Sequence, residues 1–218
     1  MSKQHVMEMG VNVRKLNEDI ALFPQVTPIT EEMNKLLKGV SRLVMLDRYA
    51  FKDTAKNTLS EGDFVILTVK EDPKFPARGM GYVLELNRET NKAKILVEEE
   101  FRGVLEGEEA ETGIVTKSID VVEKPLELYW EQIAHRNARG LSETEATEEL
   151  RKKWFNKFYK ELVEMNFIPA GRVLYGAGSG SEVTYFNCYV MPYVKDSRGG
   201  ISDHRKQVME IMSRGGKR

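Results

Sequence analysis

Four short runs rich in β-branched residues, separated by turn-forming residues, constrain the fold of this chain most strongly. The runs are DFVILTVK, GYVLEL, KAKILVE and GIVTKSIDVV, and they lie between Gly62 and Val122. Asp-Pro, Asn-Arg-Glu-Thr-Asn and glycine-containing turns separate them. Short strands at this spacing are typical of a small antiparallel barrel. The sequence therefore predicts a compact β unit over residues 56–123.

This β unit resembles an SH3-like barrel, because a Gly62-Asp63 pair leads into the first run and Gly81 opens the second. The acidic stretch from Glu98 to Glu111 is interpreted as a solvated face. Some small barrels bind nucleic acid, but that function needs a basic surface. With 33 basic and 34 acidic residues, the chain has a net charge of −1. Nucleic-acid binding is therefore disfavoured.

Composition narrows the remaining function classes. The 218 residues are 41% hydrophobic, which is enough to support a core. The sequence contains no run of about 18 uncharged apolar residues and no apolar leader, so neither a membrane span nor a signal peptide is predicted, and a cytoplasmic location is expected. One cysteine cannot form an intrachain disulfide, and three scattered histidines predict no metal site.

Helical patterns flank the β unit. Apolar residues from Thr30 to Val44 recur at the spacing of a helix with one buried face, and Thr30 is the expected N-cap. After the β unit, Pro125 and Gly140 are expected to bracket another helix.

A second helix is expected directly afterwards, with Ser142 and Glu145 as a capping box at its start. Five of its apolar residues fall on one stripe: Leu150, Trp154, Phe158, Leu162 and Met165. Two consecutive one-sided helices predict a helical hairpin over residues 124–165.

Four ordered motifs occupy the segment that follows. They are P-x-G-R at 169–172, N-C-Y-V-x-P at 187–192, D-S-x-x-G-I at 196–201 and S-R-G-G at 213–216. Their order and spacing resemble the start of the catalytic barrel of ribonucleotide reductases, most closely the adenosylcobalamin-dependent (class II) branch. The earlier stretch VMLDRYAFKD is similar to the opening of the same family. The resemblance implies a first barrel strand over Val183–Met191, followed by a helix.

The expected fold class is α+β. An N-terminal helix, a small SH3-like antiparallel β-barrel insertion and a helical hairpin precede the first strand and helix of the reductase α/β barrel. The expected domains are an N-terminal arm (1–29), a helical segment (30–55), the β-barrel insertion (56–123), the hairpin (124–165) and the start of the catalytic barrel (166–218).

The resemblance implies roles for six residues. Cys188 would be one thiol of the redox pair, and it would contact the substrate together with Ile168, Asn187 and Gly216; Asp196 and Ser197 would bind the effector. Two alternatives from local chemistry stay open. Cys188 could be a buried, inert cysteine, and Asp196 with Ser197 could form a turn and N-cap.

The resemblance also implies what the chain needs. The radical-bearing cysteine, the second redox cysteine and most adenosylcobalamin contacts would lie beyond residue 218, so no turnover is expected from this chain alone. The expected partners are a complementing C-terminal reductase chain, a ribonucleotide substrate and a deoxynucleoside triphosphate effector, with a homodimer as a further option; neither nucleic acid nor membrane is expected. Class I membership stays open. The alternative function is a non-catalytic regulatory or scaffold module carrying an SH3-like barrel.

Overall fold

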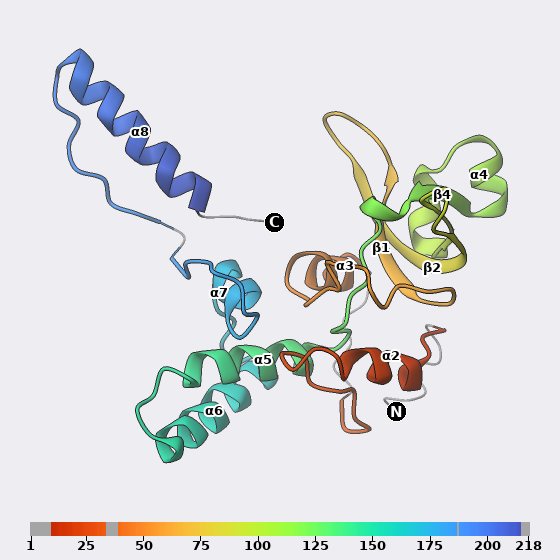
Figure 1. The fold of residues 1–218 in the computed structure, drawn as a ribbon, viewed down its shortest axis with the longest axis horizontal. Helices are drawn as coiled ribbons and strands as arrows, with labels where there is room; N and C mark the ends of the chain where they lie inside the picture. Colours follow the sequence, from red (N-terminus) through yellow and green to blue (C-terminus); the bar gives the residue numbers. More distant parts are fainter. Residues whose placement is uncertain (1–9, 34–38, 187, 215–218) are drawn as a thin grey trace. The chain divides into compact units, whose positions relative to one another are not determined.

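The computed structural model describes residues 10–33, 39–186 and 188–214 (Figure 1). The chain divides into two units, Met1–His135 and Arg136–Arg218, and each is described by itself. Within the described ranges, no helix is both long enough and apolar enough to cross a bilayer.

The first unit contains a sheet and several short helices. Its elements are α2 (Val13–Ile20), α3 (Gly39–Arg48), β1 (Phe64–Lys70), β2 (Ala77–Asn87), β3 (Lys92–Val97), the 3-10 helix η1 (Glu99–Val104), α4 (Gly107–Thr112), β4 (Ile114–Ser118) and the 3-10 helix η2 (Ile119–Val121). The four strands lie at the four β-branched runs, although β2 begins earlier than its run.

The sheet is an antiparallel meander in the order β1-β2-β3-β4 that curls into a half-barrel (Figure 1). Its register places Phe64 opposite Tyr82 and Ile95 opposite Val115. The barrel expected from the sequence is present only as this half-barrel, because no ladder joins β1 to β4 in the described part of the chain. Instead, Ile66 on the outer edge of β1 exchanges two backbone hydrogen bonds with Glu123, which follows η2.

Alternation along the strands builds the core of the half-barrel. In β3, Ala93, Ile95 and Val97 are fully buried, whereas Lys92 and Lys94 are exposed. A strand points successive side chains to opposite faces, so this pattern gives one buried and one exposed face. The buried face packs with other fully buried residues such as Val65, Leu67 and Val115.

Residues 30–33, where a helix is expected to start, are not helical, and the helix described in this stretch is α3 (Gly39–Arg48). Residues 34–38 lie outside the described residues, and 30–33 form a turn. The side-chain amide of Asn17 bonds both backbone groups of Ile29, at 2.8 and 3.0 Å, and the Thr30 hydroxyl donates to Glu32. These contacts hold the chain at Ile29 and Thr30 in the turn.

The expected helix start at Pro125 is also wrong, because tertiary pairing holds residues 123–127 in extended form. Leu126 donates its N–H to the carbonyl of Phe51, and Pro125 forms a β-bridge with Lys52. Helix α5 starts only at Trp130. There the Gln132 side chain accepts hydrogen bonds from the N–H groups of Leu128 and Tyr129, which satisfies two donors at the helix start.

The second unit is helical, with α5 (Trp130–Ser142) running into it from the first, followed by α6 (Glu148–Val163), α7 (Gly171–Gly176) and α8 (Arg198–Arg214). Helix α6 leads the chain back from the end of α5, which gives the expected hairpin (Figure 1).

The expected boundaries inside the hairpin differ from those observed. Gly140 lies within α5 rather than after it. Ser142 donates to the carbonyl of Arg139, and the cap of α6 is Thr147, whose side chain accepts from the N–H of Leu150 at 3.2 Å. Of the apolar stripe on α6, Leu162 is buried, whereas Leu150 and Met165 are each 38% exposed.

The strand expected at Val183–Met191 is absent from the described residues, which have no regular secondary structure there. A strand needs a hydrogen-bonded neighbour, and the described chain places none beside this segment. The helix expected after it is present as α8.

Candidate functional site

The expected site residues that the structure describes lie in the second unit and are exposed. Ile168 follows α6 and is 58% exposed, and Asp196 and Ser197 precede α8. Cys188 lies in the stretch without regular secondary structure between α7 and α8, called the extended segment (described residues 180–186 and 188–195). Asn187 and Gly216 lie outside the described residues. No hydrogen bond or ion pair joins Ile168, Cys188 and Asp196 in the structure's described ranges, so this chain does not assemble them into one pocket.

Cys188 carries a free, exposed thiol. Its neighbours are apolar but also exposed: Phe186 is 71% exposed, and Val190 is wholly exposed. The alternative of a buried, inert cysteine is therefore not supported by its surroundings here. An exposed thiol is accessible to a second thiol or a disulfide.

Ser197 is the structural start of α8. Its hydroxyl accepts a hydrogen bond from the N–H of Gly200 at 3.0 Å, and its carbonyl accepts one from Ile201. The N-cap alternative thus holds for Ser197. A serine cap retains its own O–H donor, so capping leaves it able to donate to a ligand oxygen.

Helix α7 contacts the segment that leads to Cys188 at two points. Arg172, on α7, donates to the carbonyl of Phe186. Gly176, at the end of α7, faces Val183 and Tyr185 so closely that an added Cβ would lie 3.2 Å from the Tyr185 ring and closer still to Val183. The backbone before Cys188 is therefore packed against α7.

A buried arginine holds the other end of α7. Arg136 is 0% exposed, and one of its guanidinium nitrogens donates to the carbonyls of Leu174 at 3.1 Å and Ala177 at 2.8 Å. Asn137 adds a bond to Leu174, and Arg139 donates to the carbonyl of Gly178. These carbonyls lie at a helix C-terminus, where backbone oxygens lack intrahelical partners and cations are favourable.

Sequence reasoning missed this arrangement, although the sequence carries a signal for it. Arg136 and Asn137 interrupt the buried positions Ile133, Ala134 and Ala138 of α5. A charged residue among buried apolar positions is retained only when it is paired.

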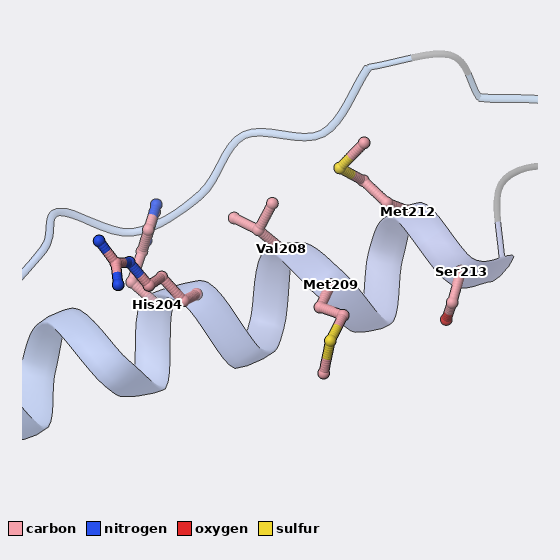
Figure 2. A pocket seen from close by; sticks show the side chains of 6 residues that line it. His204, Val208, Met209, Met212 and Ser213 are labelled. Atoms are coloured by element: carbon pink, nitrogen blue, oxygen red, sulfur yellow. The ribbon is translucent and has the colours of Figure 1, made fainter. Parts of the chain in front are cut away.

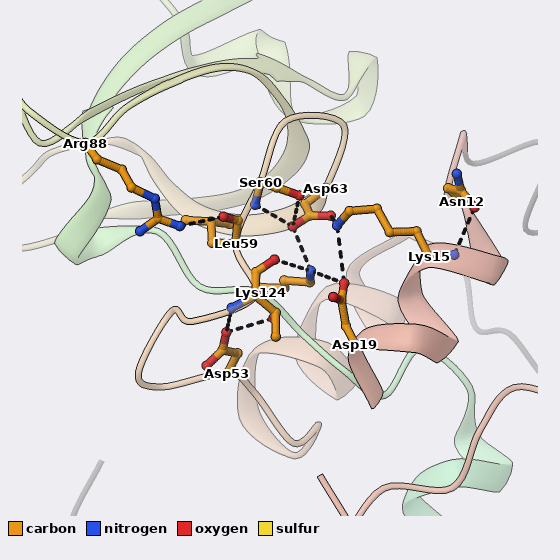
Figure 3. A network of polar contacts seen from close by, with 10 residues as sticks. Asn12, Lys15, Asp19, Asp53, Leu59, Ser60, Asp63, Arg88 and Lys124 are labelled. Carbon is orange, nitrogen blue, oxygen red and sulfur yellow. Dashed lines mark hydrogen bonds and ion pairs between the residues drawn. The ribbon is translucent and has the colours of Figure 1, made fainter. Parts of the chain in front are cut away.

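In the first unit, a network of buried charges ties three segments together (Figure 3). Lys124, 2% exposed, donates to Asp19 and Asp63 at 2.7 Å each and to the carbonyl of Thr58 at 2.9 Å. Lys15 reaches the same two carboxylates from α2. The ammonium of Lys124 uses its three donors on these partners, so the network joins α2 to the β unit and leaves this lysine no donor for a ligand.

A second charge cluster lies beside α3. Asp47 accepts from Arg78 at 2.6 Å and lies 3.5 Å from Lys52. Burial opposes ionisation of Asp47, but the hydrogen bond and charge of Arg78, together with Lys52, outweigh it, so the pKa of Asp47 lies below its ordinary value.

Glu98 shows the opposite balance. Burial raises the pKa of Glu98 although Arg42 pairs with it, and burial next to Glu98 raises the pKa of Tyr82.

No group of three or more His, Cys, Asp or Glu side chains suited to a metal ion occurs in the described ranges.

Helix α8 presents an open surface lined by His204, Arg205, Val208, Met209, Met212 and Ser213 (Figure 2). Val208 and Met212 project from one side of the helix and Met209 from the other (Figure 2). Met209 and Met212 are 64% and 73% exposed. Both methionine side chains are thus largely exposed within this chain.

Residues 121–182 match the family described as ribonucleotide reductase, all-alpha domain. The match spans α5, α6 and α7, which hold the buried arginine and its carbonyl partners. Neither the curated proteins nor the solved structures gave a match to the chain.

Proposed function

We propose that this chain, which carries the ribonucleotide reductase all-alpha domain over residues 121–182, forms the N-terminal part of a class II-like ribonucleotide reductase. The observation that carries the proposal is that this domain runs directly into the motifs N-C-Y-V-x-P, D-S-x-x-G-I and S-R-G-G. The β half-barrel would be an SH3-like insertion before that domain.

The proposed reaction replaces the 2′-hydroxyl of a ribonucleotide with hydrogen. The sugar takes up two electrons and two protons, and its hydroxyl leaves as water. The thiol of Cys188 and a second thiol from the rest of the barrel would each give one electron and one proton and would then join as a disulfide. An external dithiol would restore both by thiol–disulfide exchange, a step that the exposure of Cys188 favours.

The remaining proposed contacts follow the motifs. Ile168, Asn187 and Gly216 would border the substrate together with Cys188. Asp196 would accept a hydrogen bond from the sugar hydroxyl of a deoxynucleoside triphosphate effector, and Ser197 would donate its free O–H.

Adenosylcobalamin would supply the radical when bound, but the described residues do not fit it. The cavity between α2 and the half-barrel has a volume of about 20 Å³, enough for about one water. The surface of α8 is open rather than enclosed. We therefore assign none of these residues to the cofactor and place its site on the complementing part of the reductase.

The proposed partner is that complementing part, a C-terminal reductase chain. Exposed aromatic and aliphatic residues support it, because the extended segment and α8 present apolar surface without a cover. In the extended segment Tyr193 is wholly exposed, and on α8 Ile201 is 43% exposed. An added barrel strand would pair with the backbone of 183–191 and bury these side chains.

The test is reconstitution. The purified chain is mixed with ribonucleotide, adenosylcobalamin and a dithiol, with and without a C-terminal reductase chain, and deoxyribonucleotide is measured. Product only in the complete mixture, and its loss with Cys188→Ser, would support the proposal. Product formed equally well with Cys188→Ser would reject the redox role. Stable binding of the C-terminal chain without any product would favour a non-catalytic module.

A further inference from the structure

The buried arginine of α5 and the extended segment of Cys188 are connected through a single short helix, α7. The C-terminal carbonyls of α7 are bonded by Arg136, and its first turn bonds the Phe186 carbonyl through Arg172. Both contacts lie inside the second unit. Helix α7 therefore has one end fixed in the protein interior and the other attached to the chain just before Cys188.

Two glycines, Gly140 and Gly178, let α5 and the turn after α7 approach each other closely. A Cβ on Gly140 would lie 2.5 Å from the Cα of Gly178 and 2.8 Å from the carbonyl carbon of Ala177. Contacts this short cannot be made by a real Cβ, so helix α5 and the turn after α7 touch backbone to backbone. Gly178 itself has a φ of +69°, a conformation that residues with a side chain rarely adopt. The position of α7 against α5 is thus tightly specified.

The polar side of this attachment is costly to disturb. Arg136 is fully buried, and a buried guanidinium is stable only while its donors are bonded. Its bond to the carbonyl of Ala177 is 2.8 Å long. The arginine thus holds the turn in one place, and the turn sets the end of α7.

We propose that α7 is a positioning platform for Cys188, with Arg136 and Arg172 as positioning residues that fix where the thiol is presented. The importance of that position rests on the proposed reductase function, since a redox thiol must meet its partner thiol and the sugar at bonding distance. The platform itself can be tested without turnover, because it concerns only where Cys188 is held.

A distance measurement tests it. Cys188 is the only cysteine, so a nitroxide spin label attaches there directly, and Lys153→Cys on the exposed side of α6 takes the second label. In the otherwise unchanged chain, pulsed electron paramagnetic resonance is expected to give one narrow distance distribution. Arg172→Met is expected to abolish the narrow peak, and Arg172→Lys, which keeps one donor for Phe186, is expected to restore it.

Arg136→Lys tests the buried end, because lysine keeps the charge but cannot span the same carbonyls in one plane. The narrow peak is expected to be lost. Arg151→Met is the matched control, since Arg151 is exposed and also donates to a carbonyl, that of Glu145, which precedes α6 rather than belonging to α7. Its peak is expected to stay narrow.

If Arg136→Lys fails to fold, as judged by circular dichroism, Arg172→Met alone decides, because the Arg172 contact lies at the surface. A narrow peak retained in folded Arg172→Met overturns the proposal. The platform and the redox role can fail separately. Loss of the narrow peak in folded Arg172→Met supports the platform. Turnover by the reconstituted Cys188→Ser form rejects the redox role.

Discussion

Lys124 donates a 2.7 Å hydrogen bond to Asp63 although both side chains are almost completely removed from solvent. The bond joins the strand-like stretch after η2 to the turn before β1, and Asp19 brings α2 to the same ammonium. Removing one partner of a buried ion pair leaves the other charge buried without compensation, which is more costly than the pair was stabilising. The first unit should therefore depend strongly on Lys124.

Lys124→Met is expected to lower the free energy of unfolding of the first unit by about 3 kcal/mol. The figure is at the lower end of the range for buried pairs because Lys15 still reaches Asp63. Urea titration followed by circular dichroism measures it. Lys94→Met is the control, since the Lys94–Glu85 pair is more than half exposed. Equal midpoints for the two variants would contradict a structural role for the network.

The half-barrel could be predicted from the sequence because its signal is local. The β-branched runs and their turns give the four strands without any knowledge of distant contacts. The closure of the barrel could not be predicted, because the partner of the β1 edge is the single residue Glu123, which lies outside the four β-branched runs. A separate pairing, of Pro125 with Lys52, moves the start of α5 from Pro125 to Trp130.

The structure around the candidate site could not be predicted from local sequence in the same way. The motifs around Cys188 are visible in the sequence, but the described residues of 183–191 form no strand, since strand structure requires a neighbour. The role of Gly140 could not be predicted either. A glycine near a helix end usually marks a stop, whereas Gly140 permits the backbone contact with Gly178.

Thr147→Ala is expected to destabilise α6 by about 1 kcal/mol, because the side chain caps the N–H of Leu150. Thermal unfolding followed at 222 nm measures the shift. Thr144→Ala is the matched control, since its hydroxyl donates only to the carbonyl of Leu141 at an exposed position. A larger loss for Thr144→Ala would place the start of the helix nearer to the Ser142 cap expected from the sequence.

Acid should weaken the first unit through Asp47. Its pKa in the folded chain is below the ordinary value, so the charged form stabilises the fold at neutral pH. This contribution is present above the unfolded-state pKa, about 3.9 for an aspartate, and is lost as the pH falls through the lower folded-state pKa. Between pH 6 and pH 3, roughly the window around the unfolded-state pKa, the urea midpoint of the unaltered chain should therefore fall more than the midpoint of Asp47→Asn. Glu89→Gln, at an exposed turn, should behave like the unaltered chain.

Within the second unit, chymotrypsin is expected to cut at Tyr193, beyond the stretch that packs on α7, before it cuts within α6. Tyr193 is wholly exposed and outside regular structure, whereas Phe155 and Tyr159 lie within the hydrogen-bonded turns of α6. Mass spectrometry of early fragments locates the cuts. First cleavage within α6 would show that this helix opens more readily than the extended segment.

The last prediction concerns the proposed partner. If a C-terminal reductase chain adds the strand beside 183–191, the exposed aromatic residues of the extended segment should become covered, and the chymotrypsin cut should slow markedly. The proposed complex would bring a second cysteine near Cys188, so mild oxidation should join the two chains through a disulfide that a dithiol reverses. Non-reducing gel electrophoresis and peptide mapping identify it. Cys188→Ser should abolish the cross-link while leaving the protection from chymotrypsin intact, because the hydroxyl occupies almost the same volume. Protection without any cross-link in the unaltered complex would separate strand pairing from redox chemistry, and it would leave Cys188 as a surface thiol beside the proposed interface.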